Sequence, residues 1–577
     1  MAAPADRRFA STSEPFSGAK LAAGVWIMGL GLVGAAELTS TRPARAVPAF
    51  AQQTGLPCKS CHVGGFGPEL TPHGREFKLT GFTMREPGDG SKRSEGPTNG
   101  QSSTQGQKSA TGQSLSDDQA SAQSQANGKS MKGGQGTAQC PSKVGGPLAS
   151  AGHGPTQGRN PANPQNTTQG QPSTQTPISP SDRTPTPGRT GTTPCASQAH
   201  DTKHRSPVPL ALMAITSFTH TRRDQFPAPE HLKRNDNFVL DQVSVFLAGG
   251  IGDHFGGFAQ VTYDGVTRHL TWDNLDIRAV TQAHVLGTDD TIGLSFNNNP
   301  TVQDAWNTLP AWGFPFTDTA VSPTPAAAPL INGGFAQKVV GVTGYGWIAH
   351  KFYLEGGGYT SPSSGLLRTL GSKPNDPGSI HGIAPYARAA FQTQLAGGTF
   401  EVGGNLLRAA IFPGRDRSSG FTDRYTDWGL DSSWQKAIGK SDTLSANVRY
   451  EHERADLRAS CALGLIGDGT DLRCARYQLN ELRGAVRYTL HDKVGLTLSP
   501  FSITGSHNDN VFENGSPNSN GLMGEVDYTF WPDGNSPLGP LFNIRVGAQY
   551  TAYHKFDGRT ANASNNNALR LFAWVAF

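Results

Sequence analysis

Polar and apolar residues alternate along the chain from about Pro207 to its C-terminus. In Leu444–Tyr450, for example, leucine, alanine, valine and tyrosine alternate with serine, asparagine and arginine. Because successive side chains of a β-strand point to opposite faces, this period of two predicts strands with one apolar and one polar face. Clusters of Gly, Asn, Asp and Pro separate about sixteen such segments. The predicted strands are residues 208–220, 237–251, 255–266, 271–284, 289–297, 335–349, 351–361, 379–396, 398–410, 422–437, 441–456, 475–490, 492–506, 519–532, 541–555 and 566–577.

Strands of this length and number are typical of a transmembrane β-barrel, in which the apolar face meets lipid and the polar face lines the lumen. A soluble sandwich would turn its apolar faces inward, but the repetition of segments of about ten to fifteen residues favours the barrel. An even number near sixteen suits an antiparallel, porin-like barrel. A polar lumen needs no apolar core, in keeping with a hydrophobic fraction of 35%.

The connections between the predicted strands differ in length. Short turns, such as Gly252–His254 and Gly397, are expected on one side of the membrane. Long stretches are expected on the other side as extracellular loops: 298–334, 362–378, 457–474 and 507–518. The final strand ends on Phe577 and resembles the C-terminal signature of bacterial outer-membrane proteins. Cys461 and Cys474 bracket one candidate loop, where a disulfide is favoured over two free thiols.

Composition and charge exclude several classes of protein. The chain has 577 residues, with 71 Gly and 40 Pro, and a net charge of +4, which is too small to indicate a nucleic-acid partner. Six cysteines are too sparse for a disulfide scaffold. Outside the N-terminus no apolar run reaches the roughly 18 residues of a membrane helix, which excludes a helical membrane protein.

The N-terminus has the order of regions found in a secretory signal peptide. Arg7, Arg8 and Lys20 precede the apolar run Leu21–Ala36, and a polar stretch then ends in Ala44–Ala46. The pattern predicts a signal peptide over residues 1–46. The alternative is a membrane anchor, for which a short run rich in Gly and Ala is a poor span. Export from a bacterial cytoplasm would permit disulfides and covalent haem attachment.

One motif carries candidate chemistry. Cys58, Cys61 and His62 form C-x-x-C-H, the attachment sequence of a c-type haem. Two thiols three residues apart can each join one haem vinyl group, and the adjacent histidine can then bind the iron as its proximal ligand. Three alternatives compete: a zinc half-site, a redox-active dithiol and a structural disulfide. The sixth iron ligand would be Met84 or His73, unless that position is open or filled by another group.

The segment around this motif, residues 47–87, is near the size below which a domain usually needs a staple. Covalent haem would supply one, and the segment would also need a wall to dock against. Residues 88–205 contain no Phe, Tyr or Trp and are rich in Gln, Ser, Thr, Gly and Pro. This composition predicts a disordered linker. Its Cys140 and Cys195 could form a disulfide, pair with other chains or be incidental.

A resemblance to a known family rests on several quoted segments. These are Phe50–Gly55, Cys58–His62, Glu69–Leu79, Leu240–Ser244, Gln260–Gly265, Asn297–Asp304 and Pro310–Pro315. Together they cover about Val47–Pro87 and Asp236–Phe316, and they resemble the fused monohaem c-type cytochrome–porin family. The best-known members of that family are outer-membrane iron oxidases of iron-oxidising bacteria. The remaining strands agree with it only in style.

The resemblance implies one haem c, held by Cys58 and Cys61 with His62 on the iron, in a protein of the cell outer membrane. It further implies electron transfer from extracellular Fe(II) to a periplasmic carrier, either a cytochrome or a cupredoxin. Alternatives are a transport porin with a tethered haem and outward electron transfer to an extracellular acceptor. Composition and spacing alone do not indicate Fe(II) oxidation, so an oxidase activity is left open.

Lumen carboxylates could collect Fe²⁺, with Asp241, Asp264, Asp273 and Asp276 as candidates, although ordinary lumen polarity is the favoured explanation of them. Family members connect cytochrome and barrel through a short link, whereas a flexible linker of this length reaches about 60 Å. That exceeds the roughly 40–45 Å of a bilayer, so the haem segment could plug the lumen or be tethered below it. The predicted chain is thus mainly β, with a barrel over residues 206–577.

Overall fold

Residues 49–83, 210–285, 287–467 and 476–577 are described in a computed structural model of the chain. Several predictions fall outside the described residues: the signal peptide (1–46), the linker (88–205) with Cys140 and Cys195, the iron ligand Met84, and Cys474 of the predicted disulfide.

Short helices occur before the barrel and in its loops. They are α2 (Ala49–Thr54), η1 (Cys58–Ser60), η2 (Val63–Gly65), α3 (Pro72–Leu79), α4 (Ser364–Thr369), α5 (Arg458–Ala462) and η5 (Ala563–Asn566). The strands are β1 (Leu210–Thr221), β2 (Asn237–Ile251), β3 (Phe255–Asp264), β4 (His269–Val285), β5 (Thr288–Asn297), β6 (Val340–Ile348), β7 (Phe352–Thr360), β8 (Gly378–Ile380), β9 (Ala384–Leu395), β10 (Gly398–Pro413), β11 (Asp423–Ile438), β12 (Asp442–Asp456), β13 (Arg476–Leu490), β14 (Val494–Gly505), β15 (Ser519–Thr529), β16 (Asn543–Lys555) and β17 (Ala568–Ala576).

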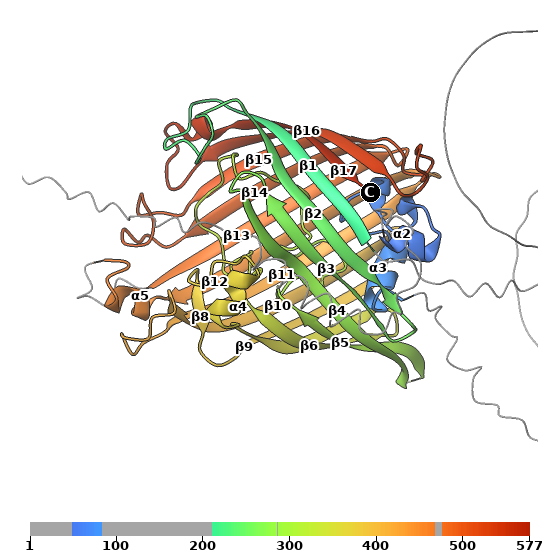
Figure 1. Ribbon diagram of the computed structural model, residues 1–577, viewed down its shortest axis with the longest axis horizontal. Coiled ribbons are helices and arrows are strands. Elements are labelled where there is room, and N and C mark those ends of the chain that lie inside the picture. Colours follow the sequence, from blue (N-terminus) through green and yellow to red (C-terminus); the bar gives the residue numbers. More distant parts are fainter. Residues whose placement is uncertain (1–48, 84–209, 286, 468–475) are drawn as a thin grey trace, which may run out of the picture. The chain divides into compact units, whose positions relative to one another are not determined.

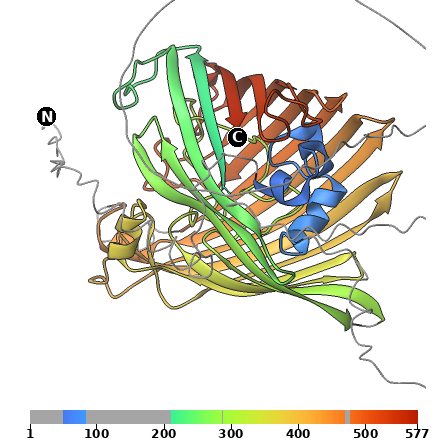
Figure 2. The same cartoon turned by 45° about the vertical axis from the view of Figure 1, so that its right-hand side comes forward.

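The described strands form one closed antiparallel sheet (Figure 1). Each long strand pairs with the next along the chain, and β1 pairs with both β2 and β17, which closes the ring. Of the 17 strands, the short β8 pairs only with the end of β10, and the other 16 make the barrel wall. Figure 2 shows the tilted strands from another side, wrapped around a common axis. The predicted 16-stranded antiparallel barrel is confirmed.

Most strand boundaries lie within a few residues of those predicted, and β2 matches its predicted range at both ends. Two predicted strands differ more. The strand expected from residue 335 begins only at Val340, because Phe335 and Val339 pack into an apolar cluster instead. The strand expected over 379–396 is divided into β8 and β9, since the turn between them contains Gly382 with a φ of +77°.

The outward face of the barrel is apolar. Alternate residues are exposed leucines and valines, with exposed fractions from 53% to 59% at Val342, Leu354, Leu430, Leu498 and Val526. Such a surface would be unstable in water and is the lipid-facing band of a transmembrane barrel. The chain is therefore a porin-like outer-membrane β-barrel. None of the described helices has the length and apolar character needed to cross a membrane.

Short turns join the strands at one end of the barrel, at residues 252–254, 349–351, 396–397, 439–441 and 491–493. Most connections at the other end are longer, as predicted. In outer-membrane barrels the short turns face the periplasm and the longer loops face outward. We call these ends the short-turn end and the long-loop end.

One long connection departs from the prediction. Residues 298–339, here called the inner loop, turn into the lumen instead of extending outward as an extracellular loop. Val302 and Leu309 in it are fully buried. The backbone N–H of Leu330 donates to Glu453 at 2.6 Å, and that of Ile331 donates to Asp427 at 2.7 Å. Both carboxylates belong to the inward face of the wall, so they hold the loop inside.

The inner loop also corrects the expectation of a lumen without an apolar core. Leu330, Ile331 and Phe335 form a buried cluster with Tyr359 and Tyr386 of the wall. Burial of these side chains stabilises the loop inside the barrel by removing apolar surface from water. The lumen of the described chain is therefore packed in part, with an apolar cluster on the inner loop.

Candidate functional site

The C-x-x-C-H motif forms a compact turn. Proline at position 57 precedes η1, and the backbone N–H groups of Cys61 and His62 donate to the carbonyl of Cys58 at 3.1 and 2.9 Å. This turn places Cys61 one helical turn after Cys58, and His62 follows directly. The predicted site residues Cys58, Cys61 and His62 therefore lie together on one local element.

A short hairpin and helix α3 support this turn. His62 pairs with Leu70, and the N–H of Thr71 donates to the carbonyl of Cys61 at 2.9 Å. Thr71 also caps α3, because its hydroxyl accepts from the N–H of Gly74 at 3.2 Å. A Cβ atom at Gly74 would overlap the carbonyl oxygen of Cys61. Glycine at this position therefore allows α3 to pack directly on the motif.

The state of the side chains bears on the alternative roles of the motif. Both thiols are free. Burial raises the pKa of Cys58, and burial together with Cys58 raises the pKa of Cys61 to about 11. A redox-active dithiol needs a lowered thiol pKa, so this role is disfavoured. Within the described ranges no three His, Cys, Asp or Glu side chains are grouped so that they could hold a metal ion.

His62 has the protonation state that an iron ligand needs. Burial and then the nearby charge of Arg545 lower its pKa to about 4, so its imidazole is neutral near pH 7. Its Nδ1 atom is buried, and a backbone hydrogen bond at Gly67 offsets part of the lowering of the pKa. Of the two proposed sixth ligands, His73 is exposed in the first turn of α3, and Met84 lies outside the described residues. Cys461 is disulfide-bonded, but its predicted partner also lies outside them.

Helix α3 is seated against the inward face of the barrel near the short-turn end. Arg278 of β4 donates to the carbonyl of Lys78 at 2.8 Å, and the hydroxyl of Tyr345 of β6 donates to the carbonyl of Leu79 at 2.9 Å. The indole N–H of Trp347 donates to Glu76 at 3.1 Å. These contacts come from two sectors of the wall and bind mainly backbone atoms, so they fix the position of the helix.

The hairpin that follows the motif is held from the other side of the lumen. Arg545 of β16 donates to the carbonyl of Phe66, and Asn543 donates to that of Gly65 at 3.3 Å. The ring of Phe66 packs edge-on against Trp574, with centroids 4.9 Å apart. Residues 49–83 thus contact the wall at several separate places.

The inner loop makes the third set of contacts. Asn307 accepts from the N–H of Leu70 at 3.0 Å and donates to the carbonyl of Pro68 at 2.8 Å. The ammonium of Lys78 donates to the carbonyl of Asp304 at 2.6 Å and lies 4.6 Å from the ring centre of Trp312. The candidate site therefore joins three parts of the chain: the motif segment, the barrel wall and the inner loop.

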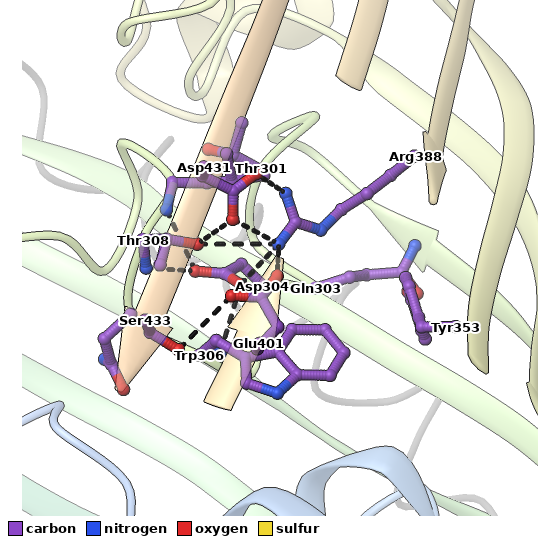
Figure 3. A network of polar contacts seen from close by, with 12 residues as sticks. Thr301, Gln303, Asp304, Trp306, Thr308, Tyr353, Arg388, Glu401, Asp431 and Ser433 are labelled. Atoms are coloured by element: carbon purple, nitrogen blue, oxygen red, sulfur yellow. Dashed lines mark hydrogen bonds and ion pairs between the residues drawn. The ribbon is translucent and has the colours of Figure 1, made fainter. Parts of the chain in front are cut away.

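A charged network anchors the part of the inner loop around Asp304 to the barrel wall (Figure 3). Arg388 of β9 contacts Asp431 at 2.8 and 2.9 Å, Glu401 at 3.3 Å and Asp304 at 3.4 Å. The other carboxylate oxygen of Asp304 accepts from the N–H groups of Thr308 and Leu309. One residue, Asp304, thereby couples the wall to the loop by its side chain and to Lys78 by its backbone.

Burial changes the charge of Lys78 itself. Removal from water, followed by the charge of Arg278, lowers its pKa to about 7, although Asp276, Asp304 and Glu355 act in the opposite direction. Near neutral pH this side chain is therefore only partly protonated. Docking of the segment is expected to respond to pH for that reason.

The four candidate Fe²⁺ carboxylates are not brought together. Asp241 pairs with Arg570 at 2.9 Å, and Asp276 pairs with Arg278 at 2.7 Å. Asp273 accepts from Thr262 and Gln337, and Asp264 accepts from N–H groups of its own turn. Each carboxylate already has a structural partner, so the proposed shared role in collecting iron is not supported.

Sequence reasoning missed several residues of the barrel wall and the inner loop that hold the motif segment in place, directly or through Asp304. They are Arg278, Asp304, Asn307, Tyr345 and Arg388. No local motif marks them, since their partners lie tens to hundreds of positions away in the chain. The only signal was their place: the strand residues occupy inward positions of the alternating pattern, and Asp304 ends one of the segments quoted for the family resemblance.

No family model and no curated protein matches this chain. Solved structures with similar folds are outer-membrane proteins. OmpT of Vibrio cholerae is 10% identical and is matched over 64% of this chain and 96% of its own, with a TM-score of 0.34. OmpF of Salmonella typhi, solved with daunomycin, is 10% identical over 64% and 97%, with a TM-score of 0.38. The channel DcaP of Acinetobacter baumannii is 13% identical over 64% and 96%, with a TM-score of 0.35. Because these scores are low, the barrel assignment rests on the strand pairing itself.

Proposed function

We propose that this chain is an outer-membrane electron conduit, in which one c-type haem attached to Cys58 and Cys61 passes electrons between the two sides. The observation that carries the proposal is the seat of the motif segment. The wall and the inner loop hold the segment inside the barrel, near the short-turn end. A redox group attached there would lie at the entrance to the periplasm, within reach of a soluble carrier.

The residues present fit such a group. The two thiols are free, and His62 is neutral near pH 7 with its Nδ1 atom buried. His62 would bind the iron, and Met84 or His73 would be the sixth ligand. When bound, a haem supplies one-electron oxidation and reduction. The chain itself positions the motif through α3 and Asn307, and it leaves both thiols partly buried.

The direction and partners follow from the family resemblance. We propose extracellular Fe(II) as the donor and a periplasmic cytochrome or cupredoxin as the acceptor, with an Fe(II) oxidase activity as the consequence. Outward transfer to an extracellular acceptor remains the reverse alternative. The haem midpoint potential separates them, because a clearly positive value favours accepting electrons from Fe(II) and a strongly negative value favours the outward direction.

A second candidate is a transport porin whose haem segment gates the lumen. The barrel alone favours this function, since porin-like barrels pass small solutes. The packing of the lumen argues against a freely open channel, because Asp276, Arg278 and Glu451 on the inward face are fully buried. Solute flux through the unaltered chain in liposomes, at a rate independent of any redox partner, would support the porin.

The test of the conduit uses the full chain in proteoliposomes, with Fe(II) outside and a cytochrome inside. Replacing Cys58 and Cys61 by Ala should leave an inserted barrel that lacks covalent haem stain and transfers no electrons. Ser60→Ala is the matched control, because it changes the same turn and leaves both thiols and their spacing intact. A covalent haem signal in the double variant would contradict the proposal. Equal rates of electron transfer in the double variant and the unaltered chain would contradict it as well.

A further inference from the structure

The outward face of the barrel carries a group of arginines at the long-loop end of β10, β11 and β12. Arg408, Arg424 and Arg454 are exposed there, whereas the residue before each of them is buried on the inward face. Strand alternation therefore directs these three side chains away from the lumen. On the next strand, Arg476 of β13 is also exposed, at 63% of its side chain.

The strand register places these arginines side by side. Thr426 of β11 pairs with Arg408 on one side and with Arg454 on the other. In the next row, Asp456 of β12 lies between Arg424 and Arg476 in the same way. Neighbouring strands are about 4.8 Å apart, so Arg408 and Arg454 leave the sheet about 10 Å from each other.

The outward-facing residues on the short-turn side of these arginines show at which level of the membrane the group lies. Trp428 lies one row closer to the short-turn end, 40% exposed, and packs against Tyr450 and His452 with ring centroids 5.6 and 5.5 Å away. Aromatic side chains of this kind gather at the boundary between hydrocarbon and headgroups. Leu430 and Leu482, in the following row, are exposed and apolar. The arginines begin two residues, about 7 Å, beyond the aromatic row, which is the level of the headgroups.

The charges of this group are not balanced by the protein. Asp456 is the one acidic side chain in the two rows, and Arg458 and Arg476 already contact it at 3.3 and 3.4 Å. The side chains of Arg408, Arg424 and Arg454 have no ion pair or hydrogen bond within the part of the chain that the structure describes. Three unpaired guanidinium groups that repel one another call for an anion from outside the chain.

We propose that Arg408, Arg424 and Arg454, with Arg476 beside them, bind the phosphate groups of an outer-leaflet lipid. Guanidinium groups match phosphate oxygens in pairs and hold them more specifically than lysine does. The apolar rows directly below would contact the acyl chains of the same lipid, so headgroup and chains are recognised by adjoining surfaces. The outer leaflet of a bacterial outer membrane carries phosphorylated glycolipids of this chemistry. The site is independent of the haem and of the direction of electron transfer.

The first test uses the unaltered chain in detergent. A bisphosphorylated glycolipid should raise its unfolding temperature and remain bound in native mass spectrometry. The same lipid without its phosphates, and inorganic phosphate alone, should each give a much smaller effect. Equal stabilisation by the phosphate-free lipid would overturn the proposal, because the arginines would then have no role. Equal stabilisation by inorganic phosphate would show a general anion effect and would also overturn it.

The second test removes the arginines. Replacing Arg408, Arg424 and Arg454 by Gln should lower the amount of retained phosphorylated lipid about tenfold and abolish its effect on the unfolding temperature. The matched control replaces Arg368, Lys373 and Arg417 by Gln, since these are exposed cations of the loops at the same end of the barrel. The control should retain the lipid as the unaltered chain does. Retention in the first variant, or equal loss in both, would refute the site. Should the first variant not insert, the comparison of lipids on the unaltered chain still decides.

Discussion

Asn307 offers the sharpest test of how the motif segment is held in the barrel. Its side chain accepts from the N–H of Leu70 and donates to the carbonyl of Pro68, and these are its contacts with the segment. Its backbone has a φ of +60°, a conformation that glycine adopts without strain and alanine does not. Asn307→Gly therefore deletes both contacts without straining the backbone, and it also removes the bond that the side chain donates to the carbonyl of Trp312 within the inner loop at 3.2 Å.

The expected loss of docking free energy follows from these two bonds. Each contributes about 0.5–1.5 kcal/mol net, and a buried group left without a partner costs about 1–3 kcal/mol. Water can enter part of the space that the side chain leaves, so we expect a total of about 2–3 kcal/mol. At about 1.4 kcal/mol per tenfold change, the undocked population should rise by roughly 30- to 150-fold.

Hydrogen exchange of the α3 amides measures this population. The N–H groups of Arg75 and Thr80 bond within the segment and not to Asn307. A helix as short as α3 is unstable alone in water, so these amides should exchange when the segment leaves its seat. Their exchange in Asn307→Gly should be faster by the factor given above.

Asn562→Gly is the matched control. Asn562 also has a positive φ, of 63°, but it lies in the loop before β17, and its side chain makes no cap bond. This variant should leave the exchange of the α3 amides unchanged. Unchanged exchange in Asn307→Gly, or an equal increase in both variants, would refute the conclusion that Asn307 holds the segment.

Two other outcomes are expected from the same region. Gly74→Ala should destabilise the docked segment by about 1–3 kcal/mol, because its Cβ would overlap the carbonyl of Cys61. Gly365→Ala in α4 is the control, since the space around Gly365 is open and the substitution should not destabilise the segment. Equal exchange rates of the α3 amides in both variants would contradict this prediction. Lys78 has a pKa of about 7 when the segment is docked and about 10.5 when it is free. Between these pH values the free segment binds more protons than the docked one. The free energy of docking should therefore become more favourable by up to about 1.4 kcal/mol per pH unit from pH 7 to 10. Lys78→Met should remove this slope, and a pH dependence that persists in the variant would assign it to another group.

The barrel could be predicted from the sequence because each strand carries its own signal. In β12, for example, inward Asn447, Arg449 and Glu451 alternate with outward Val448 and Tyr450, and the structure has that strand one residue from its predicted start. The inner loop carried no such signal. Leu330 and Ile331 have no periodic neighbours, and their burial depends on Glu453 and Asp427 from distant strands. Only tertiary packing shows that this loop folds inward.

The candidate site divides in the same way. Cys58, Cys61 and His62 were found because their spacing is local, and the turn they form depends on a few adjacent hydrogen bonds. The seat depends on Arg278, which is 200 positions away from the Lys78 carbonyl that it binds. An inward arginine in a barrel strand reads as lumen polarity when only the sequence is available. Its contact with the motif segment is a property of the folded chain.

The positions of Phe82 and β1 bear on the length of the chain between them. Gln53 joins the carbonyl of Phe82 to the N–H of Gly250, and Leu210 at the start of β1 pairs with Leu247, three residues earlier on the same strand. Phe82 and Leu210 are therefore about 15 Å apart, from three residues along a strand and one strand spacing. About five extended residues would cover that distance.

The distance to be spanned thus does not explain a connection of this length. Docking of the motif segment should survive removal of most of the connection. Deletion of residues 88–186 should leave the exchange of the α3 amides within about twofold of the full chain, because the remaining residues still exceed the span that is needed. Inserting Gly-Ser residues of the same number in place of 88–186 is the control for length. Faster exchange in the deletion but not in the replacement would show that length itself holds the segment in place. Faster exchange in both would show that the natural sequence of the tract contributes to docking, and either result would contradict the conclusion that wall and inner loop suffice.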